Sequence, residues 1–428
     1  MNEKDIRHLM ESYFDRLWPI CRSITGNGLR ESLKILSEIV PLQLTEVPTG
    51  TEVFDWTIPK EWNITDAYII TPDGKKICDF KVNNLHVVNY SIPVEKEMTF
   101  DELDRHLFSI PQMPSAIPYV TSYYKETWGF CLAHSEREKL PANGLYKVKI
   151  ASSLENGSLT YGEHVLEGKT KEEILFSTYV CHPSMANNEL SGPLVAAFLY
   201  TKLAALPERR FTYRFVFAPE TIGVIAFLQK NGAALKKNLR AGYVITCAGD
   251  AGAFTYKRSK DPLSAADHVA EHVLKHSGKK FTAIDFAIGG SDERQYCSPG
   301  FNFPVGSLMR TMYQRYPEYH TSLDNKSFIS FAAMEETVEM YLRFAKLHEM
   351  NRKYTNTVPF CEPQLGKRGL YPDVGAQKNR AEELSRRLHL LSWADGNNDL
   401  VAIAEKNGTC ALDYENTIRE LAAAGLLV

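Results

Sequence analysis

The sequence lacks a long apolar segment, closely paired cysteines and an excess of charge of either sign. Its longest uncharged apolar run lies around Pro193–Tyr200, far short of the roughly 20 residues that cross a bilayer, so we expect no membrane partner. The net charge of −3 argues against broad neutralisation of phosphates, and nucleic acid is therefore not expected as the principal partner. The charged N-terminal residues lead directly into helical periodicity and do not have the form of a signal peptide.

The eight cysteines form no C-x-x-C pair and no dense framework, which is typical of reduced thiols in the cytoplasm. What the chain does contain is an ordinary globular composition, with 44% hydrophobic and 24% charged residues. At 428 residues it should form about three folding units. The sequence therefore predicts a globular cytoplasmic protein of several domains.

The hydrophobic pattern changes along the chain. Two amphipathic helices open it, and residues 51–159 then carry short strands broken by prolines, with a hairpin signal at Asp73-Gly74. Beyond this segment strands alternate with helices up to residue 350, which predicts an α/β fold with a mixed, mostly parallel sheet and helices on both faces. A discontinuous domain of residues 1–50 and 160–350 is thus expected around an inserted β-rich domain.

The C-terminal part has a different rhythm. Residues 351–380 are rich in proline and glycine, as in a linker, and three short helical stretches follow. This predicts a winged-helix-like domain over residues 355–428. Its acidic residues largely cancel its arginines. We therefore expect the domain to pack on the catalytic domain or on a second subunit of a homo-oligomer, rather than on DNA.

Ligands of open α/β sheets gather beyond the carboxyl ends of the strands. This chain places polar side chains at several such ends, namely His182, Glu189, Glu220, Asp250, Asp292, Arg294, Arg310, Tyr313 and His320. Zinc takes imidazole and carboxylate ligands and keeps one position for water, and a neighbouring carboxylate can remove the proton of that water. The pattern therefore favours the site of a divalent-metal hydrolase.

Each of these residues also has a purely structural interpretation. A histidine after a strand is more often a loop or core residue, and His320 stands in a tyrosine-rich loop that could be a packing cluster. Glu189 could open a helix, where the dipole favours a carboxylate, and Asp292 could cap a helix that begins near Glu293. These interpretations lose weight because all the residues fall on one edge of one predicted sheet.

Residues 165–350 resemble the zinc aminopeptidase and carboxypeptidase superfamily. The similar segments are Asn187–Gly192, Pro219–Gly223, Ser291-Asp292 and Tyr319–Asp324. The whole chain resembles the aminopeptidase-like family of bacterial proteins connected with polysaccharide biosynthesis, through Pro19–Gly28, Cys181–Ser184, Gly290–Tyr296 and Pro304–Arg310. The resemblance implies a zinc-exopeptidase-like fold with an inserted β-rich domain and a C-terminal winged helix.

The chain departs from a two-zinc aminopeptidase at the metal-binding positions. Carboxylates of the superfamily are replaced by Ser184, Asn188, Thr221 and Thr246 or Cys247. Too few carboxylates remain to balance two divalent ions held close together. The resemblance therefore implies a single zinc ion held by His182, Glu189 and His320, with Asn188 as the alternative ligand if the loop register is shifted.

The resemblance assigns the role of general base to Glu220. Arg294 or Arg310 would stabilise the oxyanion or pair with a substrate carboxylate, and Tyr313 is a further candidate donor to the tetrahedral intermediate. Two aspartates would support the ligands or face the substrate: Asp250, and Asp292, which could orient His320 or hold an amine. The β-rich domain would cover this edge of the sheet and restrict access to small substrates.

We expect a single-metal hydrolase that cleaves an amide or peptide bond of a small peptide-like or N-acyl substrate. Its specificity would be aminopeptidase-like or carboxypeptidase-like, and the resemblance implies a link to surface polysaccharide biosynthesis. The alternative is a non-catalytic, metal-containing module that binds a ligand or joins an assembly for glycan synthesis. The lost carboxylates favour this alternative, whereas the retained Glu220 and His320 oppose it.

Overall fold

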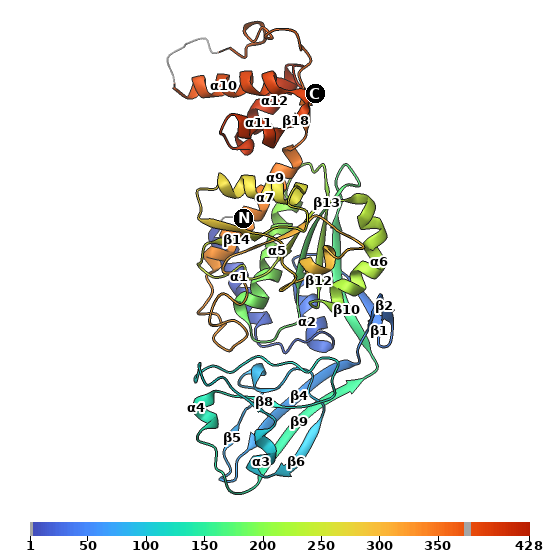
Figure 1. Ribbon diagram of the computed structural model, residues 1–428, viewed down its shortest axis with the longest axis vertical. Coiled ribbons are helices and arrows are strands. Elements are labelled where there is room, and N and C mark those ends of the chain that lie inside the picture. The colour runs from blue at the N-terminus through green and yellow to red at the C-terminus, as the bar shows by residue number, and fades with distance from the viewer. Residues whose placement is uncertain (1–2, 372–377) are drawn as a thin grey trace. The chain divides into compact units, whose positions relative to one another are not determined.

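The structure is a computed structural model that describes residues 3–371 and 378–428 (Figure 1). The chain divides into two compact units. Unit 1 comprises Met1–Ala266 and Phe281–Glu339, and unit 2 comprises Asp267–Lys280 and Met340–Val428. The segments predicted as a β-rich domain and as a catalytic sheet thus lie in the same unit. Within the described residues, no helix combines the length and the apolar character that crossing a bilayer requires.

Unit 1 contains an eight-stranded mixed sheet with the order β1-β10-β12-β11-β13-β16-β14-β15. The strands are β1 Gln43–Pro48, β10 Ser158–Leu166, β11 Glu173–Tyr179, β12 Thr212–Ala218, β13 Leu239–Ile245, β14 Phe254–Lys257, β15 Phe281–Ile284 and β16 Val305–Met309. The central strands β12, β11, β13 and β16 pair in parallel, and β1, β10 and β14 join by antiparallel pairing. The predicted mixed, mostly parallel sheet is confirmed. The sequence pattern had not indicated the short strands β14 and β15.

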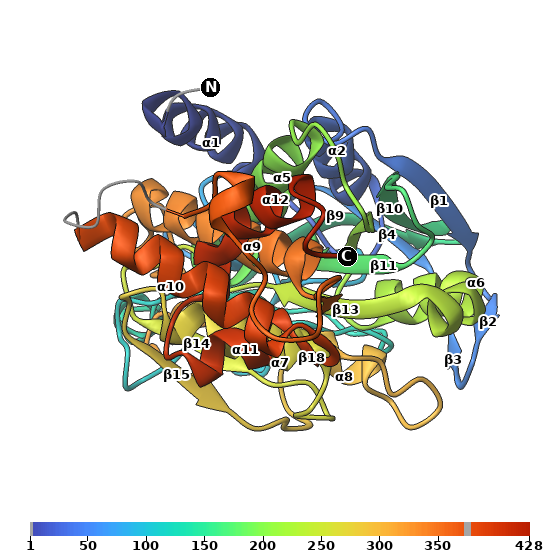
Figure 2. The ribbon, with the colours of Figure 1, turned by 90° about the horizontal axis from the view of Figure 1, so that it is seen from above.

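Helices cover both faces of this sheet (Figure 2). All seven residues of β11 are buried, and alternate residues of a strand point to opposite faces. Leu175 and Tyr179 pack in one core cluster with residues of α6 (Ile222–Asn238). Thr178 lies on the other face, where α5 (Ser191–Ala204) begins so close that a Cβ on Gly192 would stand 2.6 Å from Thr178 Oγ1.

Of the other α-helices that lie wholly in unit 1, two precede the strand–helix alternation and three are four or five residues long. They are α1 Glu3–Leu17, α2 Asn27–Leu36, α3 Phe100–Asp104, α4 His134–Arg137 and α8 Glu293–Tyr296. Both α1 and α2 contact α5. The two helices that the sequence placed before the β-rich segment are therefore part of the layer that covers the α5 face of the sheet.

A second, four-stranded antiparallel sheet has the order β5-β4-β9-β6 (Figure 1). Its strands are β4 Glu61–Ile70, β5 Lys76–Ile77, β6 Val94–Met98 and β9 Tyr146–Glu155. The hairpin predicted at Asp73-Gly74 is confirmed, because β4 pairs with β5 across it and Gly74 has a φ of 83°. Shorter pairs also occur, formed by β2 Glu52–Val53 with β3 Trp56–Thr57 and by β7 Leu107–Phe108 with β8 Phe130–Cys131.

Unit 2 carries the C-terminal helices. Its elements are most of α7 (Ala265–Lys275), the second half of α9 (Phe331–Met350), α10 Lys378–Trp393, α11 Leu400–Lys406 and α12 Glu415–Ala423, with the strands β17 Lys353–Thr355 and β18 Asp395–Asp399. Asp399 accepts a hydrogen bond of 2.8 Å from the backbone N–H of Ala402 and so caps the start of α11. The three short helices that the sequence predicted in the tail are confirmed.

Candidate active site

Ten non-glycine residues in the described part of unit 1 have a φ in the left-handed region, and four of them lie in loops at one edge of the eight-stranded sheet. These four residues are Ser184, Thr221, Cys247 and His320, with φ values of 48°, 64°, 45° and 55°. They follow β11, β12, β13 and β16, the central parallel strands. Such backbone strain persists only where surrounding contacts enforce it, and it is concentrated at functional sites. Four of the strained positions thus lie at the carboxyl edge of the sheet that the sequence had indicated.

His182 follows β11 and is held from behind by Glu189. The Nδ1 atom of His182 lies 3.0 Å from Glu189 Oε2, while Glu189 Oε1 accepts a hydrogen bond of 2.7 Å from the Cys181 N–H. The Glu189 side chain is fully buried, in a π-helical turn that spans Ala186–Leu190. Burial opposes protonation of His182, but Cys181 and Glu189 raise its pKa well above the ordinary value. In the neutral form, which a metal ligand requires, the carboxylate keeps the proton on Nδ1 and leaves the lone pair of Nε2 for another partner.

Asp324 fixes the turn that carries Glu189. Its two carboxylate oxygens accept the backbone N–H groups of Asn187 and Asn188 at 2.6 and 2.9 Å, and its carbonyl accepts that of Ala186 at 3.0 Å. Burial raises the pKa of Asp324 to about 6, although the backbone donors oppose this rise. The loop of His320 and the turn after His182 are thus joined in one hydrogen-bonded structure.

His320 faces His182 across this edge. The two ring centres lie 5.5 Å apart, and His320 Nε2 lies 3.0 Å from Asn188 Oδ1. Asn188 donates its amide Nδ2 to Tyr179 at 2.7 Å, which leaves its oxygen directed at His320. Burial, with a smaller contribution from the charge of His182, lowers the pKa of His320 to about 3. The ring is therefore neutral, as a metal ligand must be.

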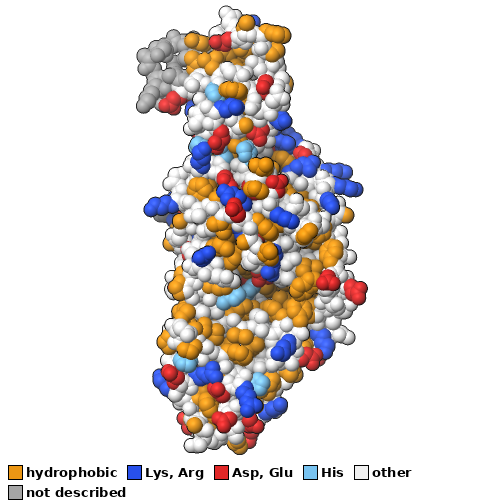
Figure 3. Space-filling model, in the orientation of Figure 1, with side chains coloured by type: hydrophobic (Ala, Val, Ile, Leu, Met, Phe, Trp, Pro, Cys, Tyr) orange, Lys and Arg blue, Asp and Glu red, His pale blue; other side chains and the backbone are white. Residues whose placement is uncertain are grey.

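The β-rich segment contributes Tyr119, which the sequence analysis did not single out. The Tyr119 ring centre lies 5.2 Å from each of the rings of His182 and His320, and its N–H donates to the His320 carbonyl at 2.8 Å. In Figure 3 histidine side chains are visible among hydrophobic ones at the level between the two sheets of unit 1. The proline and tyrosine content of residues 111–124 gave no signal of this contact, since it depends on the pairing of Pro118 with Thr321.

Glu220 follows β12 and faces the other nitrogen of His182. Its Oε2 lies 3.6 Å from His182 Nε2, and 26% of its side chain is exposed. The Glu220 N–H donates to Cys181 Sγ at 3.3 Å. Burial raises the pKa of the Glu220 carboxyl, and the charges of His182 and Arg294 oppose that rise. A partly accessible carboxyl with a raised pKa is suited to proton transfer near neutral pH.

The turn after Glu220 is held by Asp292 and Arg294. Thr221 has φ 64° and ψ −79°, and the N–H of Ile222 donates to the Glu220 carbonyl at 2.8 Å, which closes a strained γ-turn. Asp292 Oδ1 accepts the Thr221 N–H at 2.7 Å, and Arg294 Nη2 donates to Thr221 Oγ1 at 2.8 Å. Burial and the charge of Glu220 raise the pKa of Asp292. Asp292 thus supports Glu220, and it does not make the predicted contact with His320.

Three predicted residues are engaged away from His182. Asp250 accepts hydrogen bonds from Thr311 and Asn187 and so links two loops. The Arg310 guanidinium donates to Ala333 and Thr337 of α9 and pairs with Glu336 of the same helix. The Tyr313 hydroxyl bonds to Lys257 and Glu293 within a buried network. The geometry therefore gives no support to Arg310 or Tyr313 as groups that stabilise an oxyanion.

The described side chains include donors suited to a metal ion, and their hydrogen bonds bear on which of the predicted residues could hold it. At Zn–N distances near 2 Å, two imidazoles on one ion have ring centres roughly 5 Å apart, close to the separation of His182 and His320. The donor atoms of Cys181, His182 and Glu189 lie within 4.8 Å of one another, a group to which His320 does not belong. However, burial raises the pKa of Cys181 to about 11, and both Glu189 oxygens are already hydrogen-bonded. Asn188 is therefore the better candidate for a third metal donor, and Glu189 is the group that contacts His182 Nδ1.

Two family models match adjoining parts of the chain. A model described as a domain of unknown function, DUF4910, matches residues 11–351, and a winged helix-turn-helix model matches residues 352–428. A Clostridium acetobutylicum protein, named as a candidate polysaccharide biosynthesis protein with an aminopeptidase-like domain, is 48% identical over 394 residues. This alignment covers 92% of this chain and 90% of that protein. The similarity thus extends over nearly the whole length of both chains.

Solved structures establish the fold. A crystal structure of a candidate peptidase from Clostridium acetobutylicum has a TM-score of 0.93 at 45% identity, over 99% of this chain and 96% of that one. A zinc aminopeptidase from Bacillus subtilis has a TM-score of 0.57 at 12% identity, over 81% and 94% of the two chains. An M28 peptidase precursor from Shewanella amazonensis has a TM-score of 0.55 at 13% identity, over 80% of this chain and 92% of that one. The predicted zinc-exopeptidase-like fold and winged helix are confirmed.

Proposed function

This chain belongs to the DUF4910 family, and from that premise we propose that it is a single-zinc hydrolase that cleaves an amide or peptide bond of a small substrate. One observation carries the proposal. The Nδ1 atom of His182 is taken by Glu189 at 3.0 Å, so that Nε2 is directed at Glu220, 3.6 Å away, beside a neutral His320. An oriented imidazole next to a carboxyl with a raised pKa is the arrangement that metal-assisted hydrolysis requires.

His182 and His320 would hold the ion through ring nitrogens, and Asn188 would add its side-chain oxygen. A bound zinc ion would supply Lewis acidity, which polarises a carbonyl and lowers the pKa of water. The two buried or half-buried carboxylates nearest the histidines, Glu189 and Glu220, would balance its charge. The protein's own task is to hold these side chains in place, and Asp324 does so for the turn that carries Asn188.

Glu220 would accept the proton of the attacking water at its carboxylate and return it to the leaving amine. The strained turn at Thr221 keeps this carboxylate beside His182, and Asp292 and Arg294 hold the turn. Arg294 is half-buried and its charge is felt at Glu220, which makes it the arginine that can pair with a substrate carboxylate. Tyr119 lies against both histidine rings and would restrict the site to small substrates.

The name of the Clostridium relative supports a link to polysaccharide biosynthesis. We propose a small surface-polysaccharide precursor with an N-acyl or aminoacyl group as the substrate. One feature favours the alternative of a non-catalytic, metal-containing binding module: a neutral amide, Asn188, is the oxygen donor nearest His320. We also propose a reducing, cytoplasmic environment, because all eight cysteines are free, including the exposed Cys361.

The test is the metal content of the purified full chain and its activity on a panel of aminoacyl and N-acyl amides. Glu220→Gln should retain zinc and lower the rate by about 10²–10⁴-fold, as expected for the loss of a general base. Asp250→Asn is the matched control, since Asp250 is an acidic residue at a neighbouring strand end without contact to the histidines. Bound zinc without hydrolysis of any amide would favour the binding module, and retained activity in Glu220→Gln would refute the role of Glu220.

A further inference from the structure

The segment Pro19–Gly28 passes behind the candidate active site and inserts Arg22 there. The Arg22 side chain is fully buried, with its Nε 3.3 Å from the carbonyl oxygen of His182 and 3.7 Å from Glu189 Oε1. Its Nη1 donates to the Leu17 carbonyl at 2.6 Å, which ties the guanidinium to the end of α1. Arg22 thus touches both the residue that would hold the metal and the carboxylate that orients it.

The burial of this pair is costly and therefore informative. Arg22 and Glu189 each have 0% of their side chain exposed, and among the described residues Arg22 Nη2 has no hydrogen-bond partner. A buried ion pair often contributes less to stability than apolar residues of the same volume would, whereas removal of one partner is strongly destabilising. Stability alone therefore gives a weak reason for an arginine at this place. A stronger reason is its position, because Arg22 pairs with Glu189 and Glu189 in turn contacts the His182 ring.

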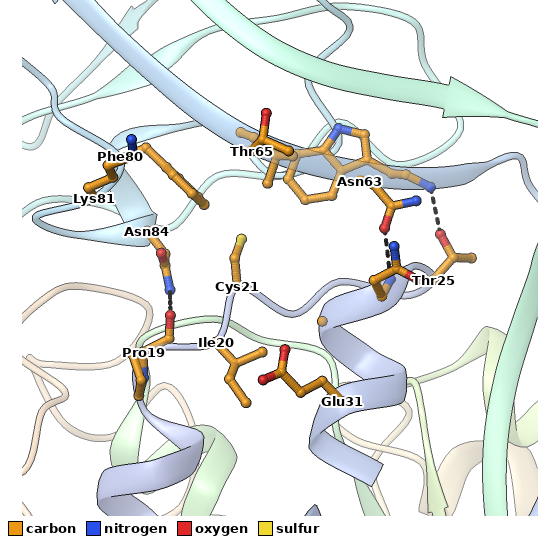
Figure 4. A pocket seen from close by; sticks show the side chains of 14 residues that line it. Pro19, Ile20, Cys21, Thr25, Glu31, Asn63, Thr65, Phe80, Lys81 and Asn84 are labelled. Carbon is orange, nitrogen blue, oxygen red and sulfur yellow. Dashed lines mark hydrogen bonds between the residues drawn. The ribbon is translucent and has the colours of Figure 1, made fainter. Parts of the chain in front are cut away.

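Figure 4 shows hydrogen bonds that join the segment Pro19–Gly28 to the β-rich segment. Asn84 Nδ2 donates to the Pro19 carbonyl at 3.2 Å, and the N–H groups of Trp62 and Asn27 donate to Thr25 Oγ1 and Asn63 Oδ1 at 3.0 and 2.7 Å. Cys21, one residue before Arg22, lines the cleft of about 550 Å³ in this view. The two neighbouring side chains thus lie in different places, with Cys21 at the cleft and Arg22 in the interior.

Glycine is required where the segment meets β4. Gly26 has a φ of 96°, and a Cβ at this position would stand 2.0 Å from the Trp62 carbonyl oxygen. The Asn89 side chain also donates its Nδ2 to the Arg22 carbonyl at 3.0 Å. The bond from Asn89 holds the carbonyl of Arg22 itself, and the close approach of Gly26 fixes the segment four residues further on. These contacts fix the backbone of the segment that carries Arg22.

We propose that Arg22 is a positioning residue of the metal site, which fixes Glu189 and the His182 backbone so that the imidazole presents Nε2. It acts through these two residues and touches no substrate. This inference rests on the proposed function, in which His182 holds the ion. The attraction of the guanidinium keeps the Glu189 carboxylate in the interior, and Nε fixes the carbonyl of the very residue whose ring must be oriented. Groups behind a metal ligand typically contribute 10–100-fold in metal affinity.

The experiment is zinc affinity, measured on the full chain by competition with a chromogenic chelator, for the wild type, Arg22→Met and Arg22→Lys. Arg214→Met is the matched control, because Arg214 is also a largely buried arginine, paired with Glu163 at 2.6 Å and Glu173 at 2.7 Å within the same unit. Arg22→Met should bind zinc about 10–100-fold more weakly. Arg22→Lys keeps the charge without the Nε contact and should fall between, while Arg214→Met should keep the wild-type affinity even if it unfolds at a lower temperature.

Equal zinc affinity of wild type and Arg22→Met would overturn the proposal, as would an equal loss in Arg22→Met and Arg214→Met, which would indicate a general effect of folding. If Arg22→Met does not fold, Arg22→Lys decides, and wild-type affinity in that variant counts against the Nε contact. His182→Ala is measured alongside. If it binds zinc as the wild type does, the proposed function fails first, and that result differs from a failure of Arg22 alone.

Discussion

Two histidine–carboxylate groups of the chain look alike and differ at one ring nitrogen. In unit 1, His182 places Nδ1 on Glu189 at 3.0 Å and leaves Nε2 facing Glu220. In unit 2, His272 places Nδ1 on Glu405 at 2.9 Å, but its Nε2 accepts the backbone N–H of Ala411 at 2.9 Å. Both ring nitrogen atoms of His272 are thus occupied. Of the two histidines, only His182 in its neutral form keeps a ring lone pair for a metal ion.

The comparison shows why donor atoms that lie close together do not make a metal site. His272, His276 and Glu405 lie within 4.8 Å of one another, as do Cys181, His182 and Glu189, and both groups hold two elements together. A metal on His272 Nδ1 would require the ring to carry its proton on Nε2, where the Ala411 N–H already points. Glu405 is also bonded to Lys275 at 2.9 Å. We therefore interpret the group of unit 2 as a structural joint between α7 and α11.

Removal of the imidazole should separate the two groups most clearly. His182→Ala should abolish stoichiometric zinc binding and lower amide hydrolysis by about a thousandfold or more, because the metal and its activation of water are lost. His272→Ala should leave the zinc content and the rate unchanged. Metal analysis after dialysis and initial rates measure both. Zinc retained in His182→Ala but lost in His272→Ala would reverse the comparison.

Exchange of the carboxylate partner should have the next largest effect. Glu189→Gln should weaken zinc binding by about 10–100-fold, because the amide orients His182 less strongly, while Glu405→Gln should have no effect on zinc. Chelator competition gives both affinities. A loss as complete as that of His182→Ala would instead support the sequence prediction that Glu189 is itself a ligand.

Stability should respond in the opposite order. His272→Ala leaves the buried N–H of Ala411 without an acceptor and should lower the free energy of unfolding of unit 2 by about 1–3 kcal/mol. Urea unfolding of the full chain, followed by circular dichroism, measures the change. His272→Gln can offer an oxygen to Ala411 and should recover part of the loss. If neither variant differs from the wild type, the joint contributes nothing measurable.

The smallest expected effect is a pH dependence of the same joint. Burial lowers the pKa of His272, with opposition from Glu405, so the folded state binds fewer protons at this ring than the unfolded state does. The stabilisation is complete above about pH 6.5 and declines as the pH falls below that value. His268 acts with the opposite sign, because Asp399 raises its pKa. The difference in unfolding free energy between wild type and His272→Gln isolates the contribution of His272, and a difference that does not vary from pH 7 to pH 5 would contradict it.

The sequence was a good guide to elements with a strong local signal. The buried run of β11 and the hairpin at Asp73-Gly74 occur as expected, because burial on both faces and a turn glycine leave marks in consecutive residues. It failed for β14 and β15, whose four residues each carry little pattern. For the site, it found the edge of the sheet and its histidines but missed Tyr119 and Arg22, which reach the edge from segments before β11.

The order of polar residues after successive strands determined by itself that His182, Glu220 and His320 would meet, since the carboxyl ends of neighbouring parallel strands share an edge. Only the tertiary structure decided what each donor atom faces. Glu189 contacts Nδ1 of His182, Arg310 donates to α9, and the Ala411 N–H donates to Nε2 of His272. These outcomes depend on hydrogen bonds between residues far apart along the chain, whose directions arise only when the elements pack.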